Sequence, residues 1–249
     1  MNLRNRVALV TGASRGLGAA IARSLAADGA KVAVNYFAGA DNAEKVVRSI
    51  EAAGGTARAF GADVRDEREV DRLVNEVVKA MGPIGILVIN ATGPQPMLPV
   101  EEITWDSCLR QLEFFVKSPL LLTKAVLAGM KARKHGRIIQ IGSEVFEAGL
   151  GTFSDYVSAK GAQLGLTRSW AREFGKWGIT VNMVSPGWIP TERHEDVPAE
   201  ALQEYAAHVP LKRMGKPEDV GKMVAYLASD AAEFITGQKI AVNGGNTVE

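Results

Sequence analysis

A tyrosine and a lysine stand four residues apart, at Tyr156 and Lys160, within a stretch of helical pattern. Residues with this spacing lie on one face of a helix. A phenol with a pKa near 10 is a poor acid or base at neutral pH, and a nearby ammonium would lower that pKa toward a useful range. Ser143 follows an earlier strand-like run, where its hydroxyl could hold a carbonyl oxygen. These three residues predict proton transfer at a carbonyl group.

A glycine-rich turn follows the first strand-like run of the chain. Gly12, Gly16 and Gly18 lie in it, directly before a helical pattern. Such glycines let the backbone approach a pyrophosphate, and the helix N-terminus offers it unpaired N–H groups. The spacing differs from the G-x-G-x-x-G fingerprint, so the position between strand and helix carries the prediction of a dinucleotide site.

The end of the second strand-like run favours NADP(H) over NAD(H). Sites for NAD usually place an acid there to hold the ribose 2′-hydroxyl. Here the run ends at Asn35 and Tyr36, and the next acid is Asp41. Arg15 lies inside the glycine turn, where a guanidinium could bind a 2′-phosphate through two hydrogen bonds. The open alternative is a solvated arginine beside an ordinary strand end.

These residues need a scaffold of alternating strands and helices. Strand-like runs occupy Val7–Val10, Val32–Asn35, Ala57–Phe60, Ile86–Ile89, Arg137–Ile141, Thr180–Val184 and Lys239–Val242. Helical patterns occupy Leu17–Ala27, Asn42–Ala53, Glu67–Ala80, Trp105–Ala132, Asp155–Gly175 and Pro217–Ala228. The alternation predicts an α/β fold, a Rossmann-like doubly wound parallel sheet of about seven strands with helices on both faces.

The chain of 249 residues is expected to form one domain, 1–249, because no linker or repeat interrupts the alternation. An irregular segment at about 187–214 is predicted to be a substrate lid. The formal net charge of +1 gives no reason to expect nucleic acid. No apolar stretch predicts a membrane span, the single cysteine favours a cytoplasmic location, and the scattered histidines predict no metal site.

The glycine turn, Ser143, Tyr156-x-x-x-Lys160 and Pro186-Gly187 together resemble the short-chain dehydrogenase/reductase family. The resemblance extends over essentially the whole chain, to the stretch 210–220 and to Ile235-Thr236-Gly237-Gln238. It is strongest toward the 3-oxoacyl-[acyl-carrier-protein] reductases. It implies that NADPH reduces a small carbonyl compound or acyl thioester, carried in some cases on an acyl carrier protein.

The resemblance also implies a role for each matching residue. Tyr156 would donate a proton to the carbonyl oxygen, Lys160 would lower its pKa and hold the nicotinamide ribose, and Ser143 would position the carbonyl. The implied cofactor-binding residues are Gly12, Ser14, Arg15, Gly16, Leu17, Gly18, Asn35, Tyr36, Asp63, Val64, Asn90, Ala91, Tyr156, Lys160, Pro186, Gly187, Ile189 and Thr191. The long helices around 105–132 and 155–175 would pair subunits into a homotetramer.

The sequence departs from the family pattern at several positions. Thr92 stands where the family has a glycine, which puts the local backbone path in doubt. Phe115 stands where many members have an active-site asparagine that helps to hold a proton-relaying water. Glu144 and Glu147 follow Ser143 closely and, unless they are merely solvated, would disfavour strongly anionic substrates.

The basic residues with which acyl-carrier reductases dock their carrier are half preserved here. The two positions fall on Lys134, beside Arg133, and on Trp177, beside Lys176. Two further functions stay open: a sugar or polyol dehydrogenase that uses the same residues in reverse, and an NADP(H)-binding sensor or scaffold with little turnover. The second alternative rests on the missing asparagine.

Overall fold

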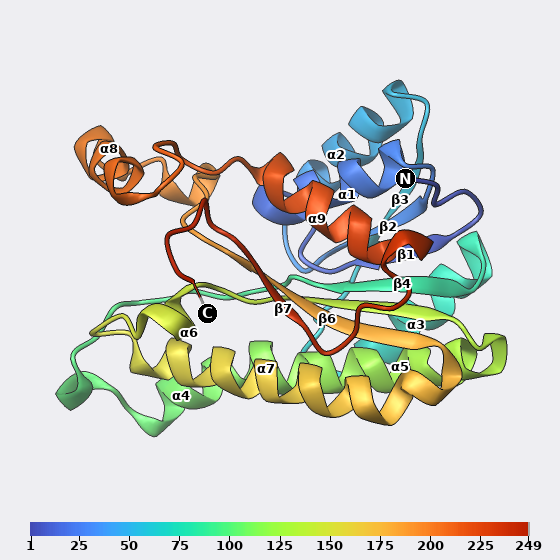
Figure 1. The fold of residues 1–249 in the computed structure, drawn as a ribbon. Coiled ribbons are helices and arrows are strands. Elements are labelled where there is room, and N and C mark those ends of the chain that lie inside the picture. Colours follow the sequence, from blue (N-terminus) through green and yellow to red (C-terminus); the bar gives the residue numbers. More distant parts are fainter. Residues whose placement is uncertain (249) are drawn as a thin grey trace.

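Seven parallel strands form one sheet in the order β3-β2-β1-β4-β5-β6-β7 in the computed structural model, which describes residues 1–248 (Figure 1). The strands are β1 (Val7–Val10), β2 (Lys31–Tyr36), β3 (Thr56–Gly61), β4 (Ile84–Ile89), β5 (Gly136–Ile141), β6 (Ile179–Pro186) and β7 (Lys239–Val242). Each predicted run falls on one of these strands. The predicted fold class is therefore confirmed.

Helices cover both faces of the sheet, as Figure 1 shows. One face carries α1 (Gly16–Ala27), α2 (Ala40–Ala52) and α9 (Pro217–Ala228), and the other carries α3 (Glu67–Met81), α5 (Ser118–Arg133) and α7 (Ser154–Phe174). Each face has its own buried apolar cluster, which explains why the central strands read as continuous apolar runs. No helix within residues 1–248 has the length and apolar character needed to cross a bilayer.

The predicted helix at 105–132 is interrupted in its middle. It consists of α4 (Trp105–Leu112), a wider π-helical turn at Glu113–Lys117, and α5. Pro119 has no N–H to donate to the carbonyl of Phe115, which disfavours regular α-helical bonding at this point. Such wide turns are frequent at functional sites. This turn places Phe115 in the protein interior, where it is 2% exposed.

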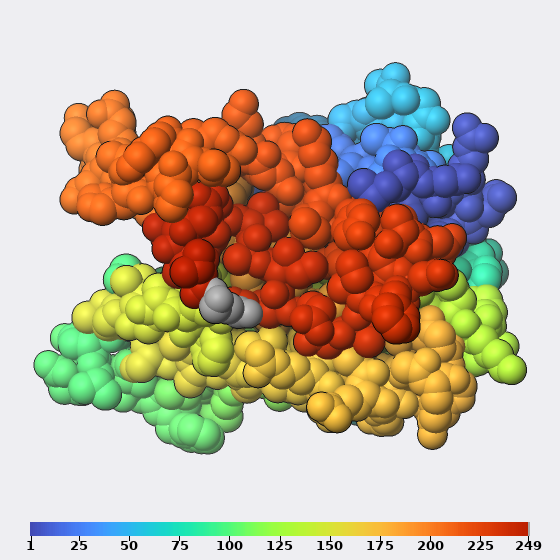
Figure 2. Space-filling model, in the orientation of Figure 1, coloured from blue at the N-terminus to red at the C-terminus, as the bar shows by residue number. Residues whose placement is uncertain are grey.

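The irregular segment 187–214 holds a 3-10 turn, Glu192–His194, and the helix α8 (Ala199–His208). Figure 1 shows α8 standing away from the sheet, at one end of the molecule. In Figure 2 the residues after β7 lie between α8 and the region of α6 (Val145–Ala148). Three segments far apart in the sequence therefore meet at the carboxyl edge of the sheet.

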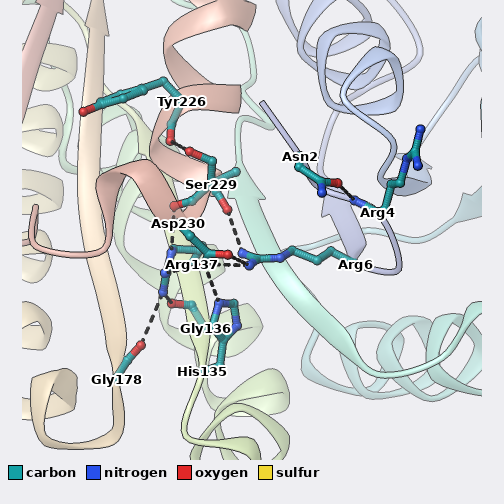
Figure 3. Close-up of polar contacts among 11 residues, drawn as sticks. Asn2, Arg4, Arg6, His135, Gly136, Arg137, Gly178, Tyr226, Ser229 and Asp230 are labelled. Carbon is teal, nitrogen blue, oxygen red and sulfur yellow. Dashed lines mark hydrogen bonds and ion pairs between the residues drawn. The ribbon is translucent and has the colours of Figure 1, made fainter.

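The opposite, amino edge of the sheet is fastened by an ion network (Figure 3). The side chain of Arg137, at the start of β5, is 3% exposed and pairs with Asp230 at 3.4 Å. It also donates to the carbonyls of Gly178 and Ser229. Arg6, just before β1, holds the Asp230 carboxylate through both oxygens at 2.5 and 2.6 Å. The network joins the start of the chain to the segment after α9.

Candidate active site

A cavity of about 930 Å³ lies along the carboxyl ends of the strands. It includes the crevice between β1 and β4, where the strand order reverses and where ligands bind in sheets of this kind. Every residue predicted from the sequence to bind the cofactor or to act in catalysis lines this cavity. A smaller cavity of about 440 Å³ touches Gly187–Ile189 and contains none of the predicted catalytic residues. The residues 1–248 contain no cluster of side chains suited to a metal ion.

The glycine turn leaves space that larger residues would fill. Gly12 has a φ of 61°, and a Cβ there would lie 2.8 Å from the Cα of Ala91. A Cβ on Gly18 would collide with the carbonyl of Gly12. Helix α1 begins at Gly16 with no side chain capping its N-terminal N–H groups, and its first residues line the cavity. The turn therefore fits a pyrophosphate group.

Polar side chains fix this turn to the sheet. Asn90 donates from Nδ2 to the carbonyls of Thr11 and Gly12, at 2.9 and 3.1 Å. The Thr11 hydroxyl accepts from the N–H groups of Asn90 and Ala91. Asn35, which is 1% exposed, donates to backbone carbonyls at the end of β3 and accepts from the Gly12 N–H. Asn35 and Asn90 thus hold the walls of the cofactor cavity.

Arg15 and Asp63 are both expected near the adenosine, but only Asp63 has an oppositely charged partner. Arg15 is exposed, and its side chain forms no hydrogen bond or ion pair with any other residue in 1–248, so its guanidinium is available to a phosphate. Asp63 is paired with Arg65 through both carboxylate oxygens, at 3.0 and 2.7 Å, and this contact lowers the pKa of the Asp63 carboxyl. Sequence reasoning missed Arg65, although it follows the predicted Asp63 and Val64 directly.

Tyr156 lies on the first turns of α7 and is 7% exposed. Its ring stacks on Phe153 at 4.7 Å and meets the edge of Phe115 at 5.3 Å, measured between ring centroids. Burial raises the pKa of Tyr156 to about 12, while a hydrogen bond with Ser143 and the charge of Arg193 act to lower it. With this pKa the phenol keeps its proton at neutral pH.

Lys160 is not among the groups that shift the pKa of Tyr156 here, so its expected effect on that pKa stays a prediction. Lys160 is fully buried and forms no ion pair within residues 1–248, so burial lowers its own pKa well below the usual value. Its Nζ donates to the Ile141 carbonyl at 2.7 Å and to Gln163 Oε1 at 3.1 Å. It also lies 3.8 Å from the centroid of the Phe115 ring. The lysine thus lies beside the tyrosine without a hydrogen bond to it.

Glu144, next to Ser143, is buried and joins three segments. Its Oε1 accepts from the hydroxyl of Tyr205 on α8 at 2.5 Å. Its Oε2 accepts from Asn243 and Asn246, after β7, at 3.1 and 3.2 Å. Burial, then this hydrogen bond, raises the pKa of Tyr205. Sequence reasoning missed this cluster because the partners of Glu144 lie 61 to 102 positions from it in the chain.

Comparison with known proteins places this geometry in a family. Residues 12–247 match the family model described as enoyl-(acyl carrier protein) reductase. The chain is 39% identical to the 3-oxoacyl-[acyl-carrier-protein] reductase of Staphylococcus aureus and 37% identical to that of Escherichia coli K12. The match to the Staphylococcus protein covers 96% of each of the two sequences, and the match to the Escherichia protein covers 98% of each.

Solved structures agree with these matches. A blue fluorescent protein from a metagenomic library, solved with NADPH, is 38% identical with a TM-score of 0.90, and all of each chain is covered. A short-chain dehydrogenase/reductase from Serratia marcescens is 36% identical over all of each chain, again with a TM-score of 0.90. A putative gluconate dehydrogenase from Agrobacterium tumefaciens is 31% identical with a TM-score of 0.94, covering all of this chain and 98% of that one. The chain belongs to the short-chain dehydrogenase/reductase family.

Two departures from the short-chain dehydrogenase/reductase pattern now have a structural description. Thr92 is tied to Gln95, whose Nε2 donates to the threonine hydroxyl at 2.7 Å. The next residue, Gly93, packs so closely on Phe114 that a Cβ would collide with the ring. Where the resemblance places an asparagine, the Phe115 ring contacts both Tyr156 and Lys160. An aromatic face therefore occupies the position of a polar side chain.

Proposed function

We propose that this protein reduces the ketone of a 3-oxoacyl thioester, or of a similar small carbonyl compound, with NADPH. The observation that carries the proposal is that Ser143, Tyr156 and Lys160 line the same cavity as the glycine turn. The proposal is supported by the printed activity of the Staphylococcus and Escherichia relatives and by the NADPH bound in the metagenomic structure.

The side chains suit the reduction of a carbonyl. Ser143 would hold the carbonyl oxygen, and Tyr156 would donate its phenolic proton to that oxygen as negative charge develops there. NADPH, when bound, supplies the hydride for the carbonyl carbon. Lys160 would bind the nicotinamide ribose, and its Nζ lies 5.6 Å from the centroid of the tyrosine ring. Burial of the phenol keeps its proton in place until the carbonyl arrives.

The cavity fits NADP(H) in particular. Arg15, exposed and unpaired in the part of the chain that the structure describes, would bind the 2′-phosphate. Strand β2 ends at Tyr36 without an acid that would hold a 2′-hydroxyl or repel a phosphate. Gly12, Gly16 and Gly18 would admit the pyrophosphate.

An acyl carrier protein would dock on a basic surface around Trp177. The Nζ atoms of Lys131 and Lys176 lie over its indole ring, at 3.9 and 4.4 Å from the centroid. Lys134 is exposed nearby in sequence, at the end of α5. The family resemblance expects a basic residue at Trp177, and Lys131 and Lys176 beside it would supply that positive charge. An acidic carrier protein would require such a charge.

Three further proposals rest on the family resemblance and on the sequence. The chain would form a homotetramer through α4, α5 and α7 of each subunit. It would act as one domain, 1–249, with the segment 187–214 as a lid over the substrate. The single cysteine favours a location in the reducing cytoplasm.

The test follows NADPH absorbance with acetoacetyl-coenzyme A, in parallel with NADH. We expect turnover with NADPH, and a loss of about 10²-fold in the Ser143→Ala variant, because one hydrogen bond to the carbonyl oxygen is removed. A second arm offers NADP⁺ with a panel of sugars and polyols. Turnover only in that arm would contradict the reductase and indicate a polyol dehydrogenase. NADPH binding without turnover on any substrate would indicate a sensor or scaffold.

A further inference from the structure

The two acids beside Ser143 are not free to repel a substrate. Glu144 is 7% exposed, and hydrogen bonds from Tyr205, Asn243 and Asn246 occupy its carboxylate. Glu147 pairs with Lys239 at 2.7 Å. The expectation that these acids disfavour anions therefore loses its basis, and the charge at the substrate end of the cavity depends on other residues.

Arg193 supplies a positive charge there. It lies in the 3-10 turn of the segment 187–214, is exposed, and lines the cavity together with Ser143 and Tyr156. Its guanidinium donates to Gln95 Oε1 at 3.4 Å and to the Gly93 carbonyl at 3.3 Å. Both contacts are long and involve neutral oxygens, and Arg193 forms no ion pair within residues 1–248. Most of its five N–H donors are available.

Successive residues of this turn face different parts of the cavity. A Cβ on Gly16 would lie 3.5 Å from Thr191 and from the Glu192 carboxylate, so those two residues face the glycine turn. Arg193 instead contacts Gly93 and Gln95, after β4. Its charge also acts on the Tyr156 phenol. Arg193 thus belongs to the substrate end of the cavity rather than to the pyrophosphate end.

We infer that Arg193 determines specificity by binding a carboxylate on the substrate, so that the enzyme prefers keto acids to neutral ketones. The inference rests on the proposed function, in which Tyr156 protonates the ketone. A guanidinium binds a carboxylate through two parallel hydrogen bonds that are stronger than its present bonds to neutral oxygens. One unpaired cation matches the single negative charge of a carboxylate.

The test compares keto acids with their own ethyl esters: acetoacetate, levulinate and 5-oxohexanoate, each as acid and as ester. In wild type we expect at least one acid to exceed its ester in kcat/KM by about 10-fold, the size of a charge-assisted hydrogen bond. Arg193→Gln should abolish that preference by raising KM for the acid by about 10-fold or more, with little effect on the ester.

Lys212→Gln is the matched control. Lys212 is another exposed cation of the segment 187–214, but it does not line the cavity and donates to the Ala207 carbonyl. We expect this variant to leave acid and ester kinetics unchanged. Equal losses on acid and ester in Arg193→Gln would overturn the inference, as would a raised KM for NADPH with no effect on the acids.

Failure of the proposed function has a different signature. If wild type reduces esters and thioesters but prefers no acid, only the inference about Arg193 fails. If it reduces nothing, the proposed function fails, and calorimetric titration with levulinate still decides the inference. Levulinate should bind more tightly than its ester to wild type and equally to Arg193→Gln, whereas equal binding of both ligands to wild type would overturn the inference.

Discussion

Strand β5 has a buried cation near each of its ends, and the two cations have opposite surroundings. Arg137, at the amino end, pairs with the Asp230 carboxylate and donates to several backbone carbonyls. Lys160 contacts the carbonyl of Ile141, at the carboxyl end, and has an amide and an aromatic ring as its other neighbours. One cation is matched by a carboxylate, and the other is not.

This difference separates stability from chemistry. An ion pair whose cation and carboxylate both have partners fixes the segments that carry them, and neither group is available to a substrate. A buried ammonium without a counter-charge costs free energy, and such groups are found where function requires them. We propose that the amino edge of the sheet stabilises the fold and that the carboxyl edge carries out the reaction. Four predictions test this division.

The largest effect is expected for Tyr156→Phe. Loss of the proton donor should lower kcat for reduction by about 10³-fold, within the range for general acids. The unfolding free energy should change little, because the ring contacts with Phe115 and Phe153 remain. Because the pKa of Tyr156 is raised to about 12, reduction by wild type should not lose rate through this group as the pH rises to about 9. Steady-state kinetics and urea unfolding measure both quantities.

The second prediction concerns the amino edge. Asp230→Asn removes the carboxylate from Arg137 and Arg6, so it should lower the unfolding free energy by about 1–2 kcal/mol, less than for a fully buried pair because Asp230 is largely exposed. Turnover per folded molecule should stay unchanged. Asp71→Asn, at an exposed aspartate with no ion pair in the described residues, is the control. A large loss of turnover in Asp230→Asn would break the comparison.

The third prediction returns to the carboxyl edge, at the contact between Glu144 and Tyr205. Tyr205→Phe removes one hydrogen bond to a buried carboxylate, which is worth about 1–2 kcal/mol. Helix α8 should then exchange its amide hydrogens faster, and KM should rise by several-fold while kcat falls less. If α8 exchanges at the wild-type rate in the variant, Glu144 does not hold the segment 187–214 in place.

The fourth prediction concerns how stability depends on pH. The folded-state pKa of Lys160 lies below that of the unfolded chain, so between the two values the unfolded state binds more protons. Stability contributed by this group must therefore rise with pH in that window, by at most about 1.4 kcal/mol per pH unit. Lys160→Met should remove that rise. Urea midpoints of both proteins between about pH 7 and about pH 9.5 give the difference.

The fold and the composition of the site could be predicted from local patterns. The spacing of apolar residues in strands and helices was enough to predict the sheet. Gly12, Ser143 and Tyr156 lie in motifs whose neighbours in sequence are also neighbours in space. The predicted residues line one cavity because the carboxyl ends of the parallel strands meet at the same edge of the sheet. Their individual roles in binding and catalysis remain predictions.

What the sequence did not reveal depends on burial and on distant contacts. The pKa of Tyr156 follows from the surroundings of its ring and not from its spacing to Lys160. Glu144 reads as a surface acid until α8 and the residues after β7 are placed against it. The helix predicted at 105–132 has an even apolar pattern, so only Pro119 signalled the wide turn that brings Phe115 to the site.

The most direct test measures turnover and unfolding free energy together in Lys160→Met and in Arg137→Met. The account predicts that Lys160→Met loses NADPH-dependent turnover by about 10²-fold or more and unfolds at the wild-type denaturant concentration or above it. It predicts that Arg137→Met unfolds earlier but keeps its turnover per folded molecule. The account would be contradicted if Lys160→Met lost stability and Arg137→Met lost turnover, because the unmatched cation would then serve the fold and the matched one the reaction.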